Sequence, residues 1–92
     1  MFGKRLKAKI FGQVQGVFFR SYIEQAAQSL GLVGWVKNES DGSVKVVAEG
    51  DKEDLKKIIK FLKRGPNSAK ITKTEIKWEK SKGEFKDFGI RY

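Results

Sequence analysis

One stretch decides the fold of this chain: Gly12-Gln13-Val14-Gln15-Gly16-Val17-Phe18-Phe19-Arg20. An alternating apolar run stops there at a glycine, and a helix pattern begins. A strand that turns through glycine into a helix leaves several backbone N–H groups without intrachain partners, all directed at one point. These groups suit an anion, and Arg20 adds a positive charge beside them. The alternative is a plain strand-to-helix turn, with Phe18 and Phe19 in the core and Arg20 in solvent.

The residues on either side predict a strand and a helix. Alternation predicts a strand at about 6–14, with apolar positions Leu6, Ala8 and Ile10. Ser21 stands three residues before Glu24, as in a capping box, so the helix is expected to start immediately after Arg20. Gly31 suits its end. Its apolar stripe has the spacing i, i+3, i+4 and i+7 and consists of Ile23, Ala26, Ala27 and Leu30.

The rest of the chain predicts a hairpin, a second helix and two further strands. The hairpin joins strands at 33–38 and 44–48 through the turn Asp41-Gly42. The second helix is expected to begin at Asp51 as its cap and to close at Gly65-Pro66. Apolar alternation then predicts two strands, one containing Thr74, Ile76 and Trp78 and a short final one containing Phe88, Ile90 and Tyr92.

This order is β-α-β-β-α-β plus a short extra C-terminal strand, in one domain spanning residues 1–92. The prediction is an α+β, ferredoxin-like sandwich: an antiparallel-type sheet with two helices on one face. The helical crossover leaves the first two strands running in the same direction, so Arg20 and Asn38 are expected at one edge of the sheet. With one strand between them, the strand axes would lie ~10 Å apart, which leaves room for a small phosphate-bearing molecule and a water.

Composition limits the chemistry that this edge can perform. The 92 residues include no cysteine, no histidine and one methionine, which removes thiol nucleophiles, histidine acid–base pairs and ordinary zinc sites. The net charge is +9, but the segment 10–50 is close to neutral, so most of the excess serves solubility and long-range attraction of anions. No membrane span or signal peptide is seen, and a cytoplasmic monomer is expected. The high lysine and glutamate content is typical of heat-adapted proteins.

The chain resembles the acylphosphatases. The resemblance rests on the stretch from Gly12 to Arg20 and on a second run, Gly31-Leu32-Val33-Gly34-Trp35-Val36-Lys37-Asn38. It extends over nearly the whole chain, apart from about the first five residues and the loop near Gly83. Further support comes from Asp41-Gly42-x-Val44, Gly50, Gly65-Pro66 with Ala69, and the ending Phe88-Gly89-Ile90-Arg91-Tyr92.

The resemblance implies a hydrolase that cleaves acyl phosphates, as small-molecule substrates, to carboxylate and inorganic phosphate without metal or organic cofactor. It implies two catalytic residues: Arg20 holds the phosphate and Asn38 positions the attacking water. The implied phosphate cradle is formed by the backbone of Gln15, Gly16, Val17, Phe18, Phe19 and Arg20. The implied reaction is compatible with a chain that has no histidine, because an acyl phosphate releases a stabilised carboxylate and needs little help from a general acid. Phe18, Phe19 and Trp35 are expected in the core rather than against substrate.

Two other classes of function are compatible with parts of this pattern. RNA-recognition domains share the element order, and the chain is basic. Their third strand carries alternating aromatic residues, whereas the strand at 43–48 here carries none, so no nucleic-acid partner is expected. A catalytically idle regulatory or carrier domain is the third possibility, since a fold does not guarantee activity. Without the topology and the resemblance, Asn38 would be read as a residue that bonds its own turn.

Overall fold

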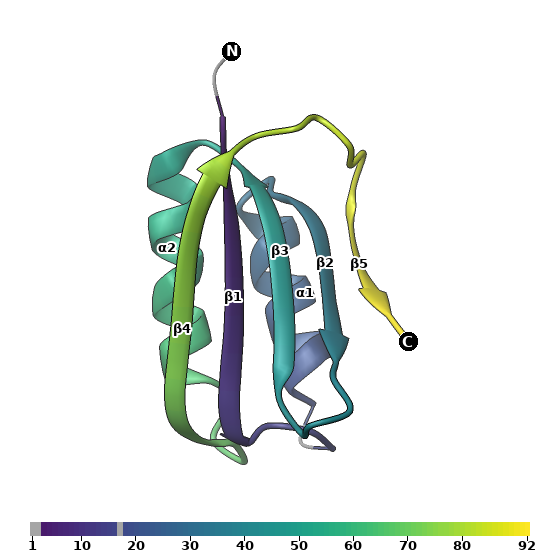
Figure 1. The fold of residues 1–92 in the computed structure, drawn as a ribbon, viewed down its shortest axis with the longest axis vertical. Coiled ribbons are helices and arrows are strands. Elements are labelled where there is room, and N and C mark those ends of the chain that lie inside the picture. The colour runs from purple at the N-terminus through teal and green to yellow at the C-terminus, as the bar shows by residue number, and fades with distance from the viewer. Residues whose placement is uncertain (1–2, 17) are drawn as a thin grey trace.

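The computed structural model describes residues 3–16 and 18–92, and these form one five-stranded sheet with both helices on the same face (Figure 1). The strand order in the sheet is β4-β1-β3-β2-β5. The predicted element order and fold class are confirmed. In chain order the elements are β1 (Lys4–Gln13), α1 (Phe19–Ser29), β2 (Val33–Asn38), β3 (Val44–Gly50), α2 (Lys52–Arg64), β4 (Lys70–Lys80) and β5 (Phe88–Arg91).

The hydrophobic core fills the layer between the sheet and the helices. Alternate strand residues point into it, as period-two patterning requires, and each fully buried aliphatic or aromatic side chain contributes about 1.5–3 kcal/mol. Its largest fully buried side chains include Leu6, Ile10, Phe19, Ile23, Val36, Leu55, Ile58 and Leu62. Because Gly34 and Val36 of β2 are buried toward the helices, Trp35 lies on the opposite, outer face and is only half-buried. The expectation that Trp35 belongs to the core is therefore wrong.

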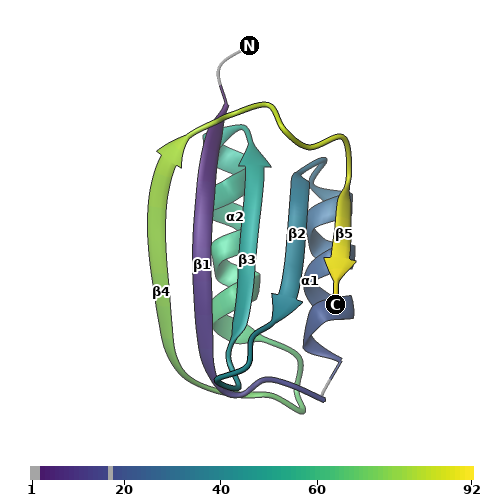
Figure 2. The same cartoon turned by 45° about the vertical axis from the view of Figure 1, so that its right-hand side comes forward.

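The strand pairing gathers three strand ends at one edge of the sheet. β3 lies between β1 and β2 and pairs antiparallel with both, so β1 and β2 run in the same direction, as predicted. β5 lies beside β2 and runs parallel to it (Figure 2). In this pairing Val36 stands opposite Ile90. Continuing this register by two residues places Tyr92 beside Asn38. The carboxyl ends of β1, β2 and β5 therefore meet at the edge where β1 leads into α1.

Helix α1 begins two residues earlier than predicted. Phe18 is its N-cap and adopts the left-handed conformation, with φ 62° and ψ 22°, and no side chain caps the helix. The backbone N–H of Tyr22 donates to the carbonyl of Phe18 at 3.0 Å, so Ser21 and Glu24 already lie inside the helix. The predicted capping box is wrong, because it would need Ser21 to be non-helical.

The other predicted helix ends agree with the structure. At the end of α1, Gly31 N–H donates to Gln28 O at 3.1 Å and Leu32 N–H to Ala27 O at 2.9 Å, which is the Schellman arrangement. Asp51 is the N-cap of α2, although its side chain makes no capping hydrogen bond, and Gly65 follows the last helical residue.

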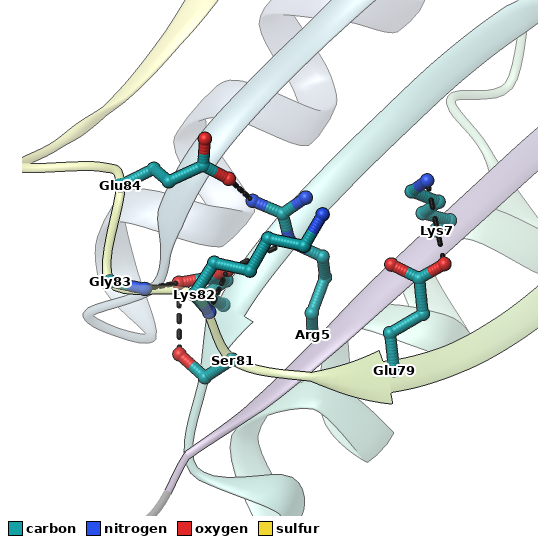
Figure 3. Close-up of polar contacts among 8 residues, drawn as sticks. Arg5, Lys7, Glu79, Ser81, Lys82, Gly83 and Glu84 are labelled. Carbon is teal, nitrogen blue, oxygen red and sulfur yellow. Dashed lines mark hydrogen bonds and ion pairs between the residues drawn. The ribbon is translucent and has the colours of Figure 1, made fainter.

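A buried carboxylate anchors the connection between β4 and β5. Glu49 of β3 is 3 % exposed and accepts from Arg5 Nε at 2.7 Å and from Ser81 Oγ at 2.9 Å (Figure 3). Its carboxylate also accepts from the backbone N–H groups of Lys82, at 2.9 Å, and Gly83, at 3.1 Å. Burial alone would raise the pKa of Glu49, but these donors outweigh it and hold the pKa below its usual value. We call this group of residues (Arg5, Glu49, Ser81, Lys82 and Gly83) the Glu49 cluster.

Candidate active site

The loop between β1 and α1 is shaped by backbone geometry that favours an anion. The pairing of β1 with β4 shifts register between Phe11 and Gly12, and a Cβ added at Gly12 would lie 2.0 Å from the carbonyl oxygen of Lys70. Gly16 has φ 71° with open space around it, so glycine serves there for its conformation and leaves room for a ligand. Left-handed residues before a helix turn successive N–H groups inward, as in known anion-binding loops.

A pocket of about 240 Å³ opens at this edge and brings the two predicted catalytic residues together. Arg20 enters it from the first turn of α1, and Asn38 from the carboxyl end of β2. Among the predicted phosphate-binding residues, Gly16, Phe18 and Phe19 also line it, whereas Val17 lies outside the described residues. The full lining consists of Val14, Gly16, Phe18, Phe19, Arg20, Ser21, Asn38, Ile90 and Tyr92.

Gln15, whose backbone N–H is predicted to contribute to the phosphate cradle, directs its side chain away from the pocket and toward the turn between β2 and β3. Its amide Nε2 donates to the carbonyl of Glu39 at 2.7 Å and to that of Ser43 at 2.9 Å. Both acceptors belong to the turn between β2 and β3, directly after Asn38. Its side chain therefore ties the anion loop to the turn that follows Asn38 and fixes the two halves of the site relative to one another.

Arg20 combines a guanidinium with the amino-terminal end of a helix. The helix dipole and the unpaired first-turn N–H groups favour negative charge at this position, so both point to the same class of ligand. The guanidinium carbon lies 4.8 Å from the centroid of the Tyr92 ring, a distance typical of cation–π stacking. The chain end thus lies against the residue predicted to bind phosphate.

Asn38 carries a buried polar atom without a partner. Among the described residues, nothing donates a hydrogen bond to its Oδ1. The adjoining turn makes its own bonds: Glu39 N–H donates to Ser43 O at 2.8 Å, and Ser43 N–H donates to Asp41 Oδ1 at 3.0 Å. The reading of Asn38 as a residue that bonds its own turn therefore does not hold for its oxygen. Leaving a buried acceptor unsatisfied costs about 1–3 kcal/mol.

Comparison with known proteins decides the family. The family model described as acylphosphatase matches residues 6–90. The chain belongs to the acylphosphatase family. It is 46 % identical over 87 residues to the acylphosphatase of Caldanaerobacter subterraneus subsp. tengcongensis, covering 95 % of this chain and 97 % of that one. It is 48 % identical over 85 residues to that of Acaryochloris marina, covering 92 % and 90 %.

Solved structures agree with the sequence comparison. The crystal structure of acylphosphatase from Bacillus subtilis superposes with a TM-score of 0.93 at 32 % identity and covers 97 % of this chain and 99 % of that chain. The predicted family, fold and enzyme class are confirmed, and the activity of an acylphosphatase is hydrolysis of the carboxyl–phosphate bond of acyl phosphates. In the described part of the chain, no helix is long and apolar enough to cross a membrane. The same residues include no group of three or more histidine, cysteine or carboxylate side chains placed to hold a metal ion.

Several residues of this acylphosphatase pocket escaped the sequence analysis. Ile90 of β5 and Tyr92, which follows β5, reach it, and Val14 and Ser21 border the loop. The alternation of the last residues predicted a strand, but which strand it would join was not predicted, and only the parallel pairing with β2 brings its end to Asn38. Phe18 was expected in the core and is 83 % exposed, whereas Phe19 is buried as expected.

Proposed function

We propose that this acylphosphatase binds the phosphoryl group of its substrate through Arg20 and the backbone N–H groups of the loop that precedes it, while Asn38 orients the attacking water. The observation that supports this most strongly is the shared pocket: Asn38 lines the same pocket as Arg20, and its buried Oδ1 accepts no hydrogen bond from the described residues. One residue offers positive charge and the other an empty hydrogen-bond position. Hydrolysis of a phosphate anhydride needs both.

Phosphate binding follows from the charges that converge on the loop. A phosphoryl group carries negative charge on three oxygens, and phosphoryl transfer depends mainly on positioning and on stabilising that charge. The guanidinium of Arg20 offers paired N–H donors in a fixed plane, and the start of α1 adds backbone donors that need no rearrangement during the reaction. Removal of one such preorganised donor lowers kcat by about 10²–10³-fold in other enzymes.

Asn38 has the chemistry of a group that orients water without deprotonating it. A carboxamide oxygen accepts a hydrogen bond from water but is too weak a base to remove its proton. Because Oδ1 is buried, water reaches it only if neighbouring groups shift. Substrate binding then completes the hydrogen bonding of the amide.

The bond changes balance without a further reagent. Water oxygen forms a bond to phosphorus as the bond between phosphorus and the acyl oxygen breaks, and that electron pair leaves on the carboxylate. The proton of the water passes to a phosphoryl oxygen, which gives inorganic phosphate. The leaving carboxylate is already a stable anion and needs no general acid, so a chain without histidine suffices for this reaction.

Hydrolysis of benzoyl phosphate in the presence of a chelator tests these roles. Arg20→Ala should lower kcat by two to three orders of magnitude, by analogy with the loss of one preorganised donor, and should also weaken inhibition by inorganic phosphate. Arg64→Ala is the matched control, because Arg64 is an exposed arginine at the other end of the chain's second helix. It should hydrolyse at the wild-type rate.

The proposed roles of Asn38 and Arg20 differ in their effect on phosphate binding, and this difference can be measured. Asn38→Ala should lower kcat while the inhibition constant of inorganic phosphate changes little, and exposed Asn67→Ala should change neither. Hydrolysis by Asn38→Ala at the wild-type rate would show that the amide does not orient the water. Unchanged phosphate inhibition in Arg20→Ala would remove Arg20 from the phosphate site.

A further inference from the structure

A row of positive side chains crosses the outer face of the sheet, on the side away from the helices. The strand register places Lys9 of β1 opposite Lys45 of β3, Lys45 opposite Lys37 of β2, and Lys37 opposite Arg91 of β5. Four cations on four adjacent strands thus stand side by side, and we call them the cationic row. With strands about 4.8 Å apart, the row is ~14 Å long.

Such a row is unfavourable for folding. Like charges directly opposite one another in a sheet destabilise it, because their Cβ atoms are only about 4.5–5.5 Å apart. Lys9 is compensated by Asp41, at 2.8 Å. In the described part of the chain, Lys37, Lys45 and Arg91 form no ion pair. The neighbouring carboxylates are engaged elsewhere: Glu75 pairs with Lys73, Glu79 with Lys7 and Lys77, and Glu84 with Arg5.

An aromatic pocket of about 230 Å³ adjoins the row. Trp35 and Phe85, both half-buried, border it, and so do Lys45 and Arg91 of the row. The rest of the lining consists of Arg5, Lys7, Val47 and the carboxylate of Glu84, which is paired with Arg5. The Arg91 guanidinium carbon lies 4.9 Å from the Trp35 ring centroid, and Lys45 Nζ lies 6.0 Å from it. Arg5 is held by its ion pair with Glu49, and its guanidinium carbon lies 5.2 Å from the Phe85 ring centroid on the other side of the pocket.

We propose that this face binds single-stranded nucleic acid, with phosphates along the cationic row and one base in the pocket between Trp35 and Phe85. Proteins that bind single strands combine a positive track for the backbone with aromatic rings or guanidinium planes on which bases stack. A duplex keeps its bases stacked inside and could offer this pocket none. An acidic peptide would satisfy the charges but would leave the aromatic pocket unused.

The proposed surface is separate from the catalytic pocket. Lys37 and Arg91 directly precede Asn38 and Tyr92 on their strands, and successive strand residues point to opposite faces. The two sites therefore lie back to back at one edge of the sheet and can be occupied together. The proposal reverses the expectation of no nucleic-acid partner, which considered aromatic residues on the third strand only. Here Trp35 stands opposite Val47 of that strand, and Phe85 comes from the loop before β5.

Fluorescence anisotropy with labelled single strands of about ten nucleotides, one of RNA and one of DNA, tests binding. The dissociation constant should rise with salt, with a logarithmic slope of roughly 2 if about three phosphates are neutralised. The triple variant Lys37→Ala, Lys45→Ala, Arg91→Ala should lose this slope. The two oligonucleotides show which sugar the face prefers, and binding of either one supports the proposal.

A matched triple variant tests whether binding depends on the cationic row itself or only on the net positive charge of the protein. Lys60→Ala, Lys63→Ala, Arg64→Ala also removes two lysines and one arginine, but from the exposed surface of α2. It should bind single strands like wild type. Equal weakening by both triple variants would overturn the proposal, and so would the absence of binding at about 50 mM salt.

The aromatic pocket has a readout of its own. In a Trp78→Phe background the remaining tryptophan is Trp35, and its emission should change when a single strand binds. Trp35→Ala should weaken binding about tenfold or more, with benzoyl phosphate hydrolysis confirming that the variant is folded, and Trp35→Phe should retain most of the affinity. Equal binding of polyglutamate and oligonucleotide, insensitive to Trp35→Ala, would overturn the proposal in favour of an acidic partner. Binding that is lost in Arg20→Ala would place the strand in the catalytic pocket instead.

Discussion

Asn38 and Glu49 carry buried oxygens at opposite ends of the hairpin formed by β2 and β3, and they differ in how these oxygens are satisfied. Glu49 accepts four hydrogen bonds, from two side chains and two backbone N–H groups. Asn38 Oδ1 accepts none from the described residues. A buried polar group with all its partners stabilises the fold, whereas an unsatisfied one costs free energy and persists where a ligand completes it. We therefore expect changes at Glu49 to act on stability and changes at Asn38, through its proposed role, to act on activity.

The largest expected effect is on stability, at Glu49. Glu49→Ala removes the acceptor of four donors and leaves Arg5 buried with Glu84 as its remaining ion-pair partner. Breaking a buried ion pair costs about 3–5 kcal/mol, which should appear as a lower urea midpoint and a lower Tm. Glu75→Ala is the control, because the pair of Glu75 with Lys73 is exposed and such pairs contribute about 0–1 kcal/mol.

The pocket proposed as the active site lies at the other end, so the Glu49→Ala protein that remains folded should still hydrolyse benzoyl phosphate. Activity should fall only as the folded fraction falls, with KM unchanged at temperatures well below Tm. If Glu49→Ala were as stable as wild type, the Glu49 cluster would not hold the β4–β5 connection. A fall in kcat for fully folded protein would show instead that the cluster acts on the pocket through β5.

Asn38→Ala should have the opposite outcome. The loss of one oriented group raises the reaction barrier by about 2.7–4 kcal/mol, but the free energy of unfolding should fall by no more than about 1 kcal/mol, because an unsatisfied acceptor is removed. Urea unfolding and hydrolysis measured on the same preparation make the comparison. A large loss of stability in this variant, with activity per folded molecule retained, would contradict a functional role for the buried oxygen.

The pH dependence of stability gives a smaller effect, which is expected at the Glu49 end of the hairpin. The pKa of Glu49 is lowered in the folded state, so its stabilising contribution is complete above the pKa of an unfolded glutamate, about 4.3, and is lost as pH falls through the lower folded value. Glu49→Gln should remove this part of the acid dependence, so Tm should fall less steeply below about pH 4 than in wild type. Asp41, whose pKa is lowered mainly by its hydrogen bond from Lys9, remains in both proteins and leaves a shared slope.

The element order and the pairing of Arg20 with Asn38 could be predicted from the sequence for a physical reason. Alternation and helical stripes are local patterns, and a helical crossover between two strands of one sheet leaves them parallel, with their carboxyl ends at one edge. Phe18 shows the limit of such patterns: its left-handed backbone and 83 % exposure come from the loop geometry, while its apolar side chain predicted the core. The helix start failed similarly, since Ser21 and Glu24 have the capping spacing but lie inside a helix that the Phe18 carbonyl begins.

Long-range pairing accounts for the remaining differences. Which face Trp35 occupies depends on which of its neighbours point to the helices, and alternation alone leaves the two faces of a strand equivalent until the core is assembled. Neither the cationic row nor the place of Tyr92 can be read from residues near them in the chain. The places of Tyr92 and Arg91 follow from β5 pairing with β2, between residues more than fifty positions apart, and the rest of the row follows from β3 pairing with β1 and β2.

The smallest predicted effect concerns Tyr92, which connects that pairing to catalysis. Its ring stacks on the guanidinium of Arg20 at 4.8 Å and is 90 % exposed, and a cation–π contact at an exposed site contributes about 0.5–1 kcal/mol. Tyr92→Ala should therefore lower kcat/KM for benzoyl phosphate by about two- to fivefold, while Tyr92→Phe, which keeps the ring, should match wild type. A loss in Tyr92→Phe as large as in Tyr92→Ala would assign the effect to the hydroxyl group. The free energy of unfolding should fall by no more than about 1 kcal/mol in Tyr92→Ala and stay unchanged in Tyr92→Phe, because the exposed ring packs on Arg20 and not on the core.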